Sequence, residues 1–247
     1  MKGRYPLLLL WGLVCLLQAI PLLAADSLPP HPFKARYNGS VVVIGVPVDL
    51  SIDGQLDMAL SKVNSGHYEM LYTITALLGT IQAHASGEFQ NGTLRPASYE
   101  QTVDVIKLRQ FHTLLTFDWQ HKLLHVNKDE QQETLPLTDL VMDPLSLHLL
   151  VMQDLQKGRK PNRYTLVNST SLRTYQATVE GEEILPTPLG KLRTLRVSTR
   201  RDKPGSERDT VLWFAPELGY LPVRIVHEKE GKEIFRMLLE ELNRDGK

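Results

Sequence analysis

Serine and histidine side chains are the first candidates for chemistry in this chain, because together they can form a nucleophile and its base. Ser146 and His148 lie two residues apart in a segment with helical spacing, and residues two apart on a helix point to different sides. The sequence also lacks a Gly-x-Ser-x-Gly run, the turn that exposes the serine of α/β-hydrolases. It therefore assigns no catalytic residue and predicts that the protein is not an enzyme.

Metal and cofactor sites have equally little support. His121 and His125 are four residues apart, which suits zinc on a helix, but they flank a predicted hairpin and lack the glutamate of a His-Glu-x-x-His motif. A glycosidase would need two acids facing one another across a cleft. The neighbouring acid pairs lie in predicted turns, where solvated charge is the usual role: Asp129/Glu130 and Glu182/Glu183. With no glycine-rich phosphate loop either, we predict no metal and no cofactor.

The stretch from Trp213 to Arg224 is the most unusual part of the sequence. Aromatic residues flank two prolines and a glycine, so a strand is expected to enter a rigid turn and leave it again. One interpretation is a ligand-binding rim for an apolar or anionic molecule, formed by Trp213, Phe214, Tyr220 and Arg224. In the interpretation that we favour, Trp213 and Tyr220 close one end of a sheet and Arg224 pairs with a nearby carboxylate.

Strand-length apolar segments separated by turn residues must position these side chains. Phe33, Ala35 and Tyr37 alternate with polar residues, which is the period-two pattern of a half-buried strand. Further strands are predicted at Val48–Met58, Tyr68–Leu78, Ile81–Phe89, Ser98–Val105, Phe111–Trp119, Leu123–Val126, Tyr164–Val167, Leu172–Val179, Lys191–Thr199, Thr210–Phe214, Val223–Lys229 and Lys232–Leu239. Turn signals occur at Asp53-Gly54, Asn91-Gly92, Glu180-Gly181-Glu182, Pro204-Gly205-Ser206 and Glu230-Gly231-Lys232. Such short connections imply antiparallel pairing.

One segment interrupts the strands. Asp143 supplies a capping carboxylate before Pro144, apolar residues recur at helical spacing, and Lys157-Gly158 ends the pattern, so a helix is predicted over residues 144–157. Its apolar face is wide, which indicates that the helix packs deep against a sheet. Glu233–Leu242 could form a second, amphipathic helix, but the Glu230-Gly231-Lys232 turn favours a strand there.

The first 25 residues have the layout of a cleaved secretory signal peptide. Lys2 and Arg4 precede an apolar run that ends in Ala24-Ala25, and a polar segment follows where a membrane anchor would carry its stop-transfer charges. The single cysteine, Cys15, lies inside that run, so the mature chain has no thiol for disulfides. We expect export to a bacterial periplasm, and no membrane span after cleavage.

Composition sets limits on the partners. Residues 1–25 hold two of the 28 basic residues and none of the 28 acidic ones, so the mature chain has a slight acidic excess. Nucleic acids usually recruit a basic stripe, and none is predicted. The two local basic clusters lie beside Gly or Pro and are interpreted as solvated turn charges: Lys157/Arg159/Lys160 and Arg200/Arg201/Lys203.

Several short runs, in order along the chain, resemble the exported bacterial proteins grouped as domain of unknown function 3108. These runs are Phe33-Lys34-Ala35-Arg36-Tyr37-Asn38-Gly39, Leu94-Arg95-Pro96 with Tyr99, Phe117-Asp118-Trp119, Asp143-Pro144-Leu145-Ser146, Thr187-Pro188-Leu189-Gly190 and residues 213–224. The resemblance covers nearly the whole mature chain, from about Phe33 to about Leu242. It implies a β-rich envelope protein with no established activity, and it supplies no catalytic residues.

Together these features predict a mainly β protein with a strongly curved antiparallel sheet, or open half-barrel, and one central helix near residues 144–157. A flexible polar lead over residues 26–32 precedes one β-rich domain over 33–242, which could consist of two coupled halves, 33–141 and 161–242. An open half-barrel leaves inward-facing side chains available to a ligand. The leading hypothesis is therefore a non-catalytic periplasmic protein that binds or carries an apolar or envelope-derived molecule, such as a lipid. An assembly factor that binds another envelope protein through a sheet edge or the Trp213–Arg224 loop is the alternative, and an envelope hydrolase is a distant third.

Overall fold

The computed structural model describes residues 31–43, 50–63, 66–90, 92–106, 110–138, 141–168 and 171–244. The predicted signal peptide over residues 1–25 and most of the lead over 26–32 lie outside the described residues. The strands are β1 (Phe33–Val43), β2 (Leu50–Val63), β3 (His67–Ala76), β4 (Gly79–Gln90), β5 (Thr93–Val105), β6 (Phe111–Asp118), β7 (Leu123–Lys128), β8 (Gln131–Pro136), β9 (Val141–Met142), β10 (Arg163–Asn168), β11 (Ser171–Thr187), β12 (Gly190–Arg201), β13 (Arg208–Ala215), β14 (Leu221–Lys229) and β15 (Lys232–Arg244). The helices are α1 (Pro144–Gln156) and the short 3-10 helix η1 (Pro216–Leu218).

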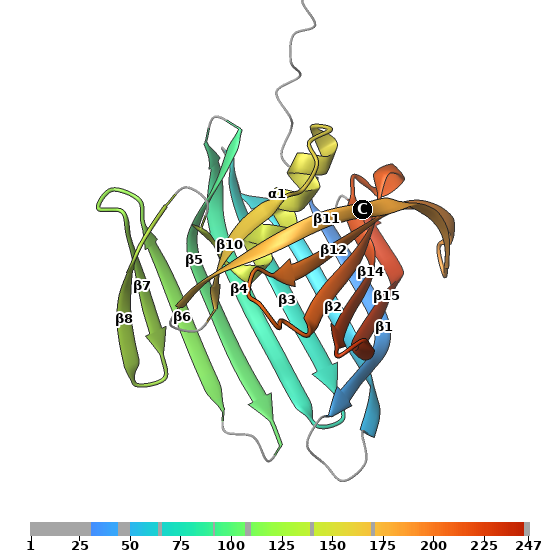
Figure 1. Cartoon of the computed structure of the whole chain (residues 1–247), viewed down its shortest axis with the longest axis horizontal. Helices are drawn as coiled ribbons and strands as arrows, with labels where there is room; N and C mark the ends of the chain where they lie inside the picture. Colours follow the sequence, from blue (N-terminus) through green and yellow to red (C-terminus); the bar gives the residue numbers. More distant parts are fainter. Residues whose placement is uncertain are drawn as a thin grey trace, which may run out of the picture.

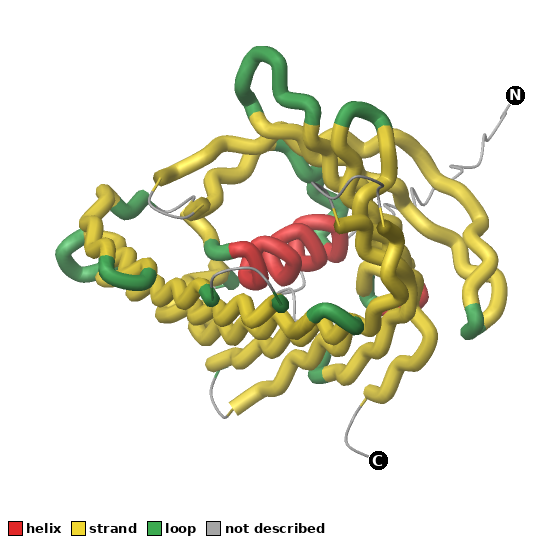
Figure 2. Tube along the Cα trace, turned by 90° about the horizontal axis from the view of Figure 1, so that it is seen from below, coloured by secondary structure: helices red, strands yellow, loops and turns green. Residues whose placement is uncertain are grey.

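All fifteen strands belong to one curved sheet. Its order is β8-β7-β6-β5-β4-β3-β2-β1-β15-β14-β13-β12-β11-β10-β9, so the first and last strands of the chain pair with one another in the middle. Neighbours are antiparallel, apart from the short parallel pair of β9 and β10. The sheet wraps around α1 (Figure 1), and seen from below the helix lies within the curve of the strands (Figure 2). Among the described residues β8 and β9 do not pair with each other, which confirms the prediction of a mainly β, open and non-closed sheet with one central helix.

The central helix begins and ends where the sequence predicts. The Asp143 side chain accepts hydrogen bonds from the first backbone N–H groups, and Pro144 occupies the first turn. Gly158 follows with a φ of +68°, a conformation that glycine adopts without strain. The face toward the sheet buries the apolar side chains Leu145, Leu149, Val151, Met152 and Leu155. Each such side chain stabilises the fold by about 1.5–3 kcal/mol.

The helix lies near one end of the strands, which we call the helix end. Lys157 Nζ donates to the carbonyl of Gly92 at 3.0 Å, and Gln156 Nε2 donates to the carbonyl of Gly219 at 3.0 Å. The β4–β5 and β13–β14 connections therefore lie beside the helix C-terminus. Because neighbouring strands are antiparallel, the β3–β4, β5–β6, β12–β13 and β14–β15 connections lie at the opposite end, which we call the far end.

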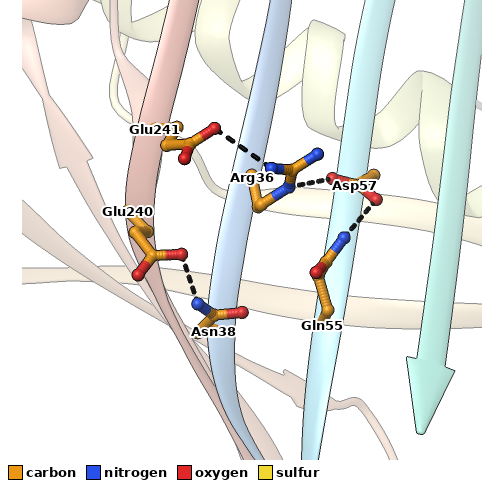
Figure 3. A network of polar contacts seen from close by, with 6 residues as sticks. All are labelled: Arg36, Asn38, Gln55, Asp57, Glu240 and Glu241. Atoms are coloured by element: carbon orange, nitrogen blue, oxygen red, sulfur yellow. Dashed lines mark hydrogen bonds and ion pairs between the residues drawn. The ribbon is translucent and has the colours of Figure 1, made fainter.

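Alternation along most strands divides the sheet into a concave apolar face and a convex polar face, whereas β13 and β14 bury residues on both faces. On β1, Ala35 and Tyr37 are buried, and the Tyr37 hydroxyl donates to the carbonyl of Pro222 at 2.8 Å. Between them Arg36 points outward, where its guanidinium pairs with Asp57 at 3.1 Å and with Glu241 at 3.2 Å. Figure 3 shows these exposed polar contacts across the strands β15, β1 and β2, formed by Arg36, Asn38, Gln55, Asp57, Glu240 and Glu241.

The structure differs from the sequence prediction in the edge strands and at two turn signals. The short strands β8 and β9 were not predicted, because Gln131–Pro136 has no apolar alternation and Val141–Met142 has only two residues. The strands β2 and β11 run without a turn through Gly54 and Gly181, and Gly181 lies at a bulge with a φ of +152°. The final segment, β15, is a strand, as the Glu230-Gly231-Lys232 turn predicts.

Candidate functional site

A buried polar group lies at the start of α1. Asp143 is fully buried, and its Oδ1 accepts hydrogen bonds from the backbone N–H groups of Leu145 and Ser146, each at 2.9 Å. Burial raises the pKa of the Asp143 carboxyl to about 6, against the opposing effect of the hydrogen bonds from Ser146. The second oxygen, Oδ2, is buried without a hydrogen-bond partner. The carboxyl therefore caps the helix at an electrostatic cost.

Ser146 and His148 have separate partners. The Ser146 hydroxyl is 2.6 Å from the hydroxyl of Tyr68, whose pKa burial raises well above its ordinary value. His148 Nδ1 donates to the carbonyl of Pro144 at 2.8 Å, and burial lowers the pKa of its ring. The helix geometry thus keeps the hydroxyl and the imidazole from acting as nucleophile and base on one another.

A second half-buried histidine, His227, lies on the concave face. Its Nδ1 lies 2.8 Å from the hydroxyl of Thr210 on the neighbouring strand, and its ring packs 4.9 Å from the ring of Phe235. Burial, and then repulsion from His148, lowers the pKa of His227 to about 4. Both imidazoles are consequently neutral at pH 7 and help to fill the interior.

Trp213 and Arg224, two of the four predicted rim residues, meet on the convex face. The Arg224 guanidinium carbon lies 4.5 Å from the indole ring centroid, and that of Arg196 lies 5.4 Å away, so the ring is held by two cations. The indole N–H donates to Glu183, while Arg224 also pairs with Glu233 at 3.2 Å. Only 5% of Trp213 is exposed, so little of the ring is open to a ligand.

The other two predicted rim residues are placed differently. Phe214 follows Trp213 on β13 and pairs with Leu195, two residues from the buried Val197, so it faces the concave side and is only 1% exposed. Tyr220 is half-buried in the turn after η1 and packs against the core. The four side chains therefore do not gather on one surface, and ligand binding by them stays a prediction.

The histidines considered for metal binding lie apart. His121 Nδ1 is 2.7 Å from Asp118, and His125 Nδ1 is 3.4 Å from the hydroxyl of Thr134. Within the described ranges, no three His, Cys, Asp or Glu side chains are grouped closely enough to hold a metal ion. No helix of the described part of the chain is long and apolar enough to span a bilayer.

Partly exposed apolar side chains occupy the concave face toward the far end. A row of cross-strand partners runs from Leu56 through Ile74, Ile81 and Val103 to Phe111. The exposed fraction rises along this row, from 0% at Leu56 and 9% at Ile74 to 37% at Phe111. We call these five residues the apolar row. Sequence reasoning predicted their strands but did not single them out, because the alternation that carries them also describes ordinary core residues.

The β3–β4 and β5–β6 connections at the far end expose further apolar side chains. Leu77, in the β3–β4 connection, is 82% exposed, and Ile106, after β5, is 61% exposed. The two connections are adjacent, since the backbone N–H of Ile106 donates to the carbonyl of Leu78 at 2.7 Å. Because contiguous apolar surface is uncommon on monomeric proteins, these two side chains are a candidate contact surface.

Comparison with known proteins agrees with the resemblance noted in the sequence. A crystal structure from Brucella abortus, described as a β-barrel-like protein of the domain of unknown function DUF1849, superposes with a TM-score of 0.60 at 9% sequence identity. The match covers 89% of this chain and all of that one, and at this identity it shows a shared fold alone. No curated protein has a significant sequence match to the chain. The family described as protein of unknown function DUF3108 matches residues 37–237. The chain therefore belongs to the DUF3108 family.

Proposed function

We propose that this protein is a non-catalytic, periplasmic binding protein that holds an apolar molecule against the far end of its concave face. The observation that carries the proposal is the apolar row, whose exposure increases toward Phe111. Burying such side chains under a ligand is favourable in proportion to the apolar area removed from water. The signal-peptide layout of residues 1–25 supports export.

The open sheet makes this end accessible in a way that a closed barrel would not. The helix contacts β3, β4, β5 and β10, and its C-terminus lies beside Gly92 and Gly219 at the helix end. Phe111 lies at the far end, where the β3–β4 and β5–β6 connections expose Leu77 and Ile106. A ligand that extends from the apolar row past the far end of the sheet would therefore contact Leu77 and Ile106.

The test compares two substitutions on opposite faces of the sheet. Phe111→Asp puts a carboxylate on the concave face, while Leu123→Asp puts one on the convex face of β7 at a side chain of almost equal exposure, 36% against 37%. We expect Phe111→Asp to weaken binding of the apolar fluorophore N-phenyl-1-naphthylamine about tenfold, because a charge must be desolvated beneath the ligand. Leu123→Asp is expected to bind the fluorophore as the wild type does. Equal binding by both variants, with both shown to be folded by circular dichroism, would refute the proposal.

The edge strand β8 favours the alternative of an assembly factor. β8 pairs only with β7 in the described sheet, and its side chains are nearly all exposed. An extended peptide could add there as a further strand. Glu133 and Pro136 limit such pairing, since a charge and a missing N–H are common protections of an edge. Two results together would favour this alternative: a crosslink from β8 to an envelope protein, and no binding of the fluorophore by the wild type.

A further inference from the structure

A strongly cationic hollow lies at the far end of the sheet, beside the β12–β13 connection. Its volume is about 430 Å³, and we call it the cationic hollow. It is lined by Arg173, Tyr175, Arg201, Lys203, Glu207, Arg208 and Lys229, together with Pro204, Gly205 and Ser206. Five of these residues carry a positive charge and one carries a negative charge.

The strand register places this hollow on the concave side. Val197 and Leu212 are paired, buried core residues, and side chains of a strand alternate between faces. Arg201 is four residues beyond Val197, and Arg208 is four residues before Leu212, so both share the face of these core residues. Tyr175 pairs with Arg201, and Lys229 pairs with Arg208, which places them on the same face.

The neighbouring hollow on the convex face shows that charge in this region is otherwise balanced. It has a volume of about 630 Å³ and shares Arg201, Lys203 and Pro204 with the cationic hollow. Four cationic and four acidic residues line it. Arg196 pairs with Glu180 at 2.7 Å. Arg200 donates two hydrogen bonds to Asp209, from Nε to Oδ1 and from Nη2 to Oδ2. The excess of positive charge in the cationic hollow therefore comes from Arg173, Arg208 and Lys229, which do not line the neighbouring hollow.

Four of the five cations of this hollow lack a counter-charge in the described part of the protein, and the fifth, Lys229, pairs with Glu230 at 3.8 Å. Among the described residues, no carboxylate lies within ion-pair distance of Arg173, Arg201, Lys203 or Arg208. The Nε–H of Arg173 is also buried without a hydrogen-bond acceptor. A buried donor of this kind destabilises the protein until an acceptor is supplied. An anion with several oxygens would supply both the missing charge and the missing acceptor.

We propose that the cationic hollow binds a phosphate group. Guanidinium groups present forked donors that match phosphate oxygens, and the Ser206 hydroxyl of the connection adds a neutral donor beside them. The apolar row shares the concave side and the far end with this hollow, so an amphiphile with a phosphate head could occupy both. This extension to an amphiphile rests on the proposed function, whereas the phosphate site itself does not.

The test uses three ligands that separate the head from the chain: decyl phosphate, decanol and methyl phosphate. Arg201→Gln and Arg208→Gln each remove one unpaired cation, and Arg200→Gln is the matched control. Arg200 is the chain neighbour of Arg201, points to the convex face and is paired with Asp209. Isothermal titration calorimetry, below the concentration at which the amphiphile forms micelles, gives the affinity of each folded variant.

We expect Arg201→Gln and Arg208→Gln each to weaken decyl phosphate binding about tenfold, the effect of one charge-assisted hydrogen bond. Decanol binding should be unchanged, and Arg200→Gln should bind all three ligands as the wild type does. Equal affinities of the wild type for decyl phosphate and decanol, with no effect of Arg201→Gln, would overturn the phosphate site and leave the proposed function intact. Equal affinities for methyl phosphate and decyl phosphate, with no decanol binding, would support the phosphate site and contradict the proposed function.

Discussion

Replacing Asp143 by asparagine should change how the stability of this protein depends on pH. Burial raises the pKa of the Asp143 carboxyl from 3.8 to about 6. Between these pH values the folded protein keeps a proton that the unfolded chain releases, so the free energy of unfolding falls as pH rises. The stabilising contribution is fully present below pH 3.8 and is lost as pH rises through 6. The difference between the two pKa values corresponds to a loss of about 3 kcal/mol.

Asparagine preserves the shape of the cap and removes the charge. Its Oδ1 can still accept from the backbone N–H groups of Leu145 and Ser146, which hold the aspartate oxygen at 2.9 Å. We therefore expect the free energy of unfolding of Asp143→Asn, relative to the wild type, to increase by about 2.5 kcal/mol between pH 4 and pH 8. Urea denaturation followed by circular dichroism at unit pH intervals measures this difference.

An exposed acid provides the control for this experiment. The Asp57 side chain is 45% exposed and pairs with Arg36 on the convex face, so Asp57→Asn removes a carboxylate without removing a buried charge. Its effect on stability should be small at every pH. A constant difference between Asp143→Asn and the wild type from pH 4 to pH 8 would refute the reasoning, because it would mean that burial does not favour the protonated acid.

Two further substitutions test the interior and the convex face. Burial lowers the pKa of His227 to about 4 from 6.5, so its stabilising contribution is present above pH 6.5 and is lost as pH falls toward 4. His227→Gln should therefore abolish about 3 kcal/mol of the acid-induced loss of stability, measured by urea denaturation at pH 4 and pH 7; an unchanged acid sensitivity would contradict this. Trp213→Phe removes the hydrogen bond to Glu183 and weakens the contact with Arg224, at a cost of about 1–2 kcal/mol. Binding of N-phenyl-1-naphthylamine should be unchanged in that folded variant, and a selective loss of binding would instead support the predicted rim.

Local sequence patterns predicted most of the elements, because the spacing of apolar residues in a segment indicates which of its side chains are buried. Ala35 and Tyr37 face the core, as their alternation indicates, and the cap at Asp143 starts the helix. The edge strand Gln131–Pro136 has no such pattern, since its side chains are nearly all exposed and it exists through backbone pairing with β7. Gly54 was also misleading as a turn signal. It lies opposite Gly39 on β1 and Ala76 on β3, and pairing on both sides keeps the strand extended.

The candidate sites were harder to predict, because they depend on which face of a strand becomes concave. Arg200, Arg201 and Lys203 were interpreted together as solvated turn charges, but Arg200 and Arg201 lie within β12 and point to opposite faces. One guanidinium is neutralised by Asp209 on the convex side, whereas the other lines the cationic hollow with Arg173 and Arg208.

Polar residues occupy both faces of β12 at this point: Ser198 and Arg200 on one side, and Thr199 and Arg201 on the other. Hydrophobic alternation therefore gives no orientation there, and only the register with Val197 and Leu212 does. A basic cluster at a strand end should accordingly be divided by residue parity before it is interpreted, since neighbouring arginines can differ in both partner and role.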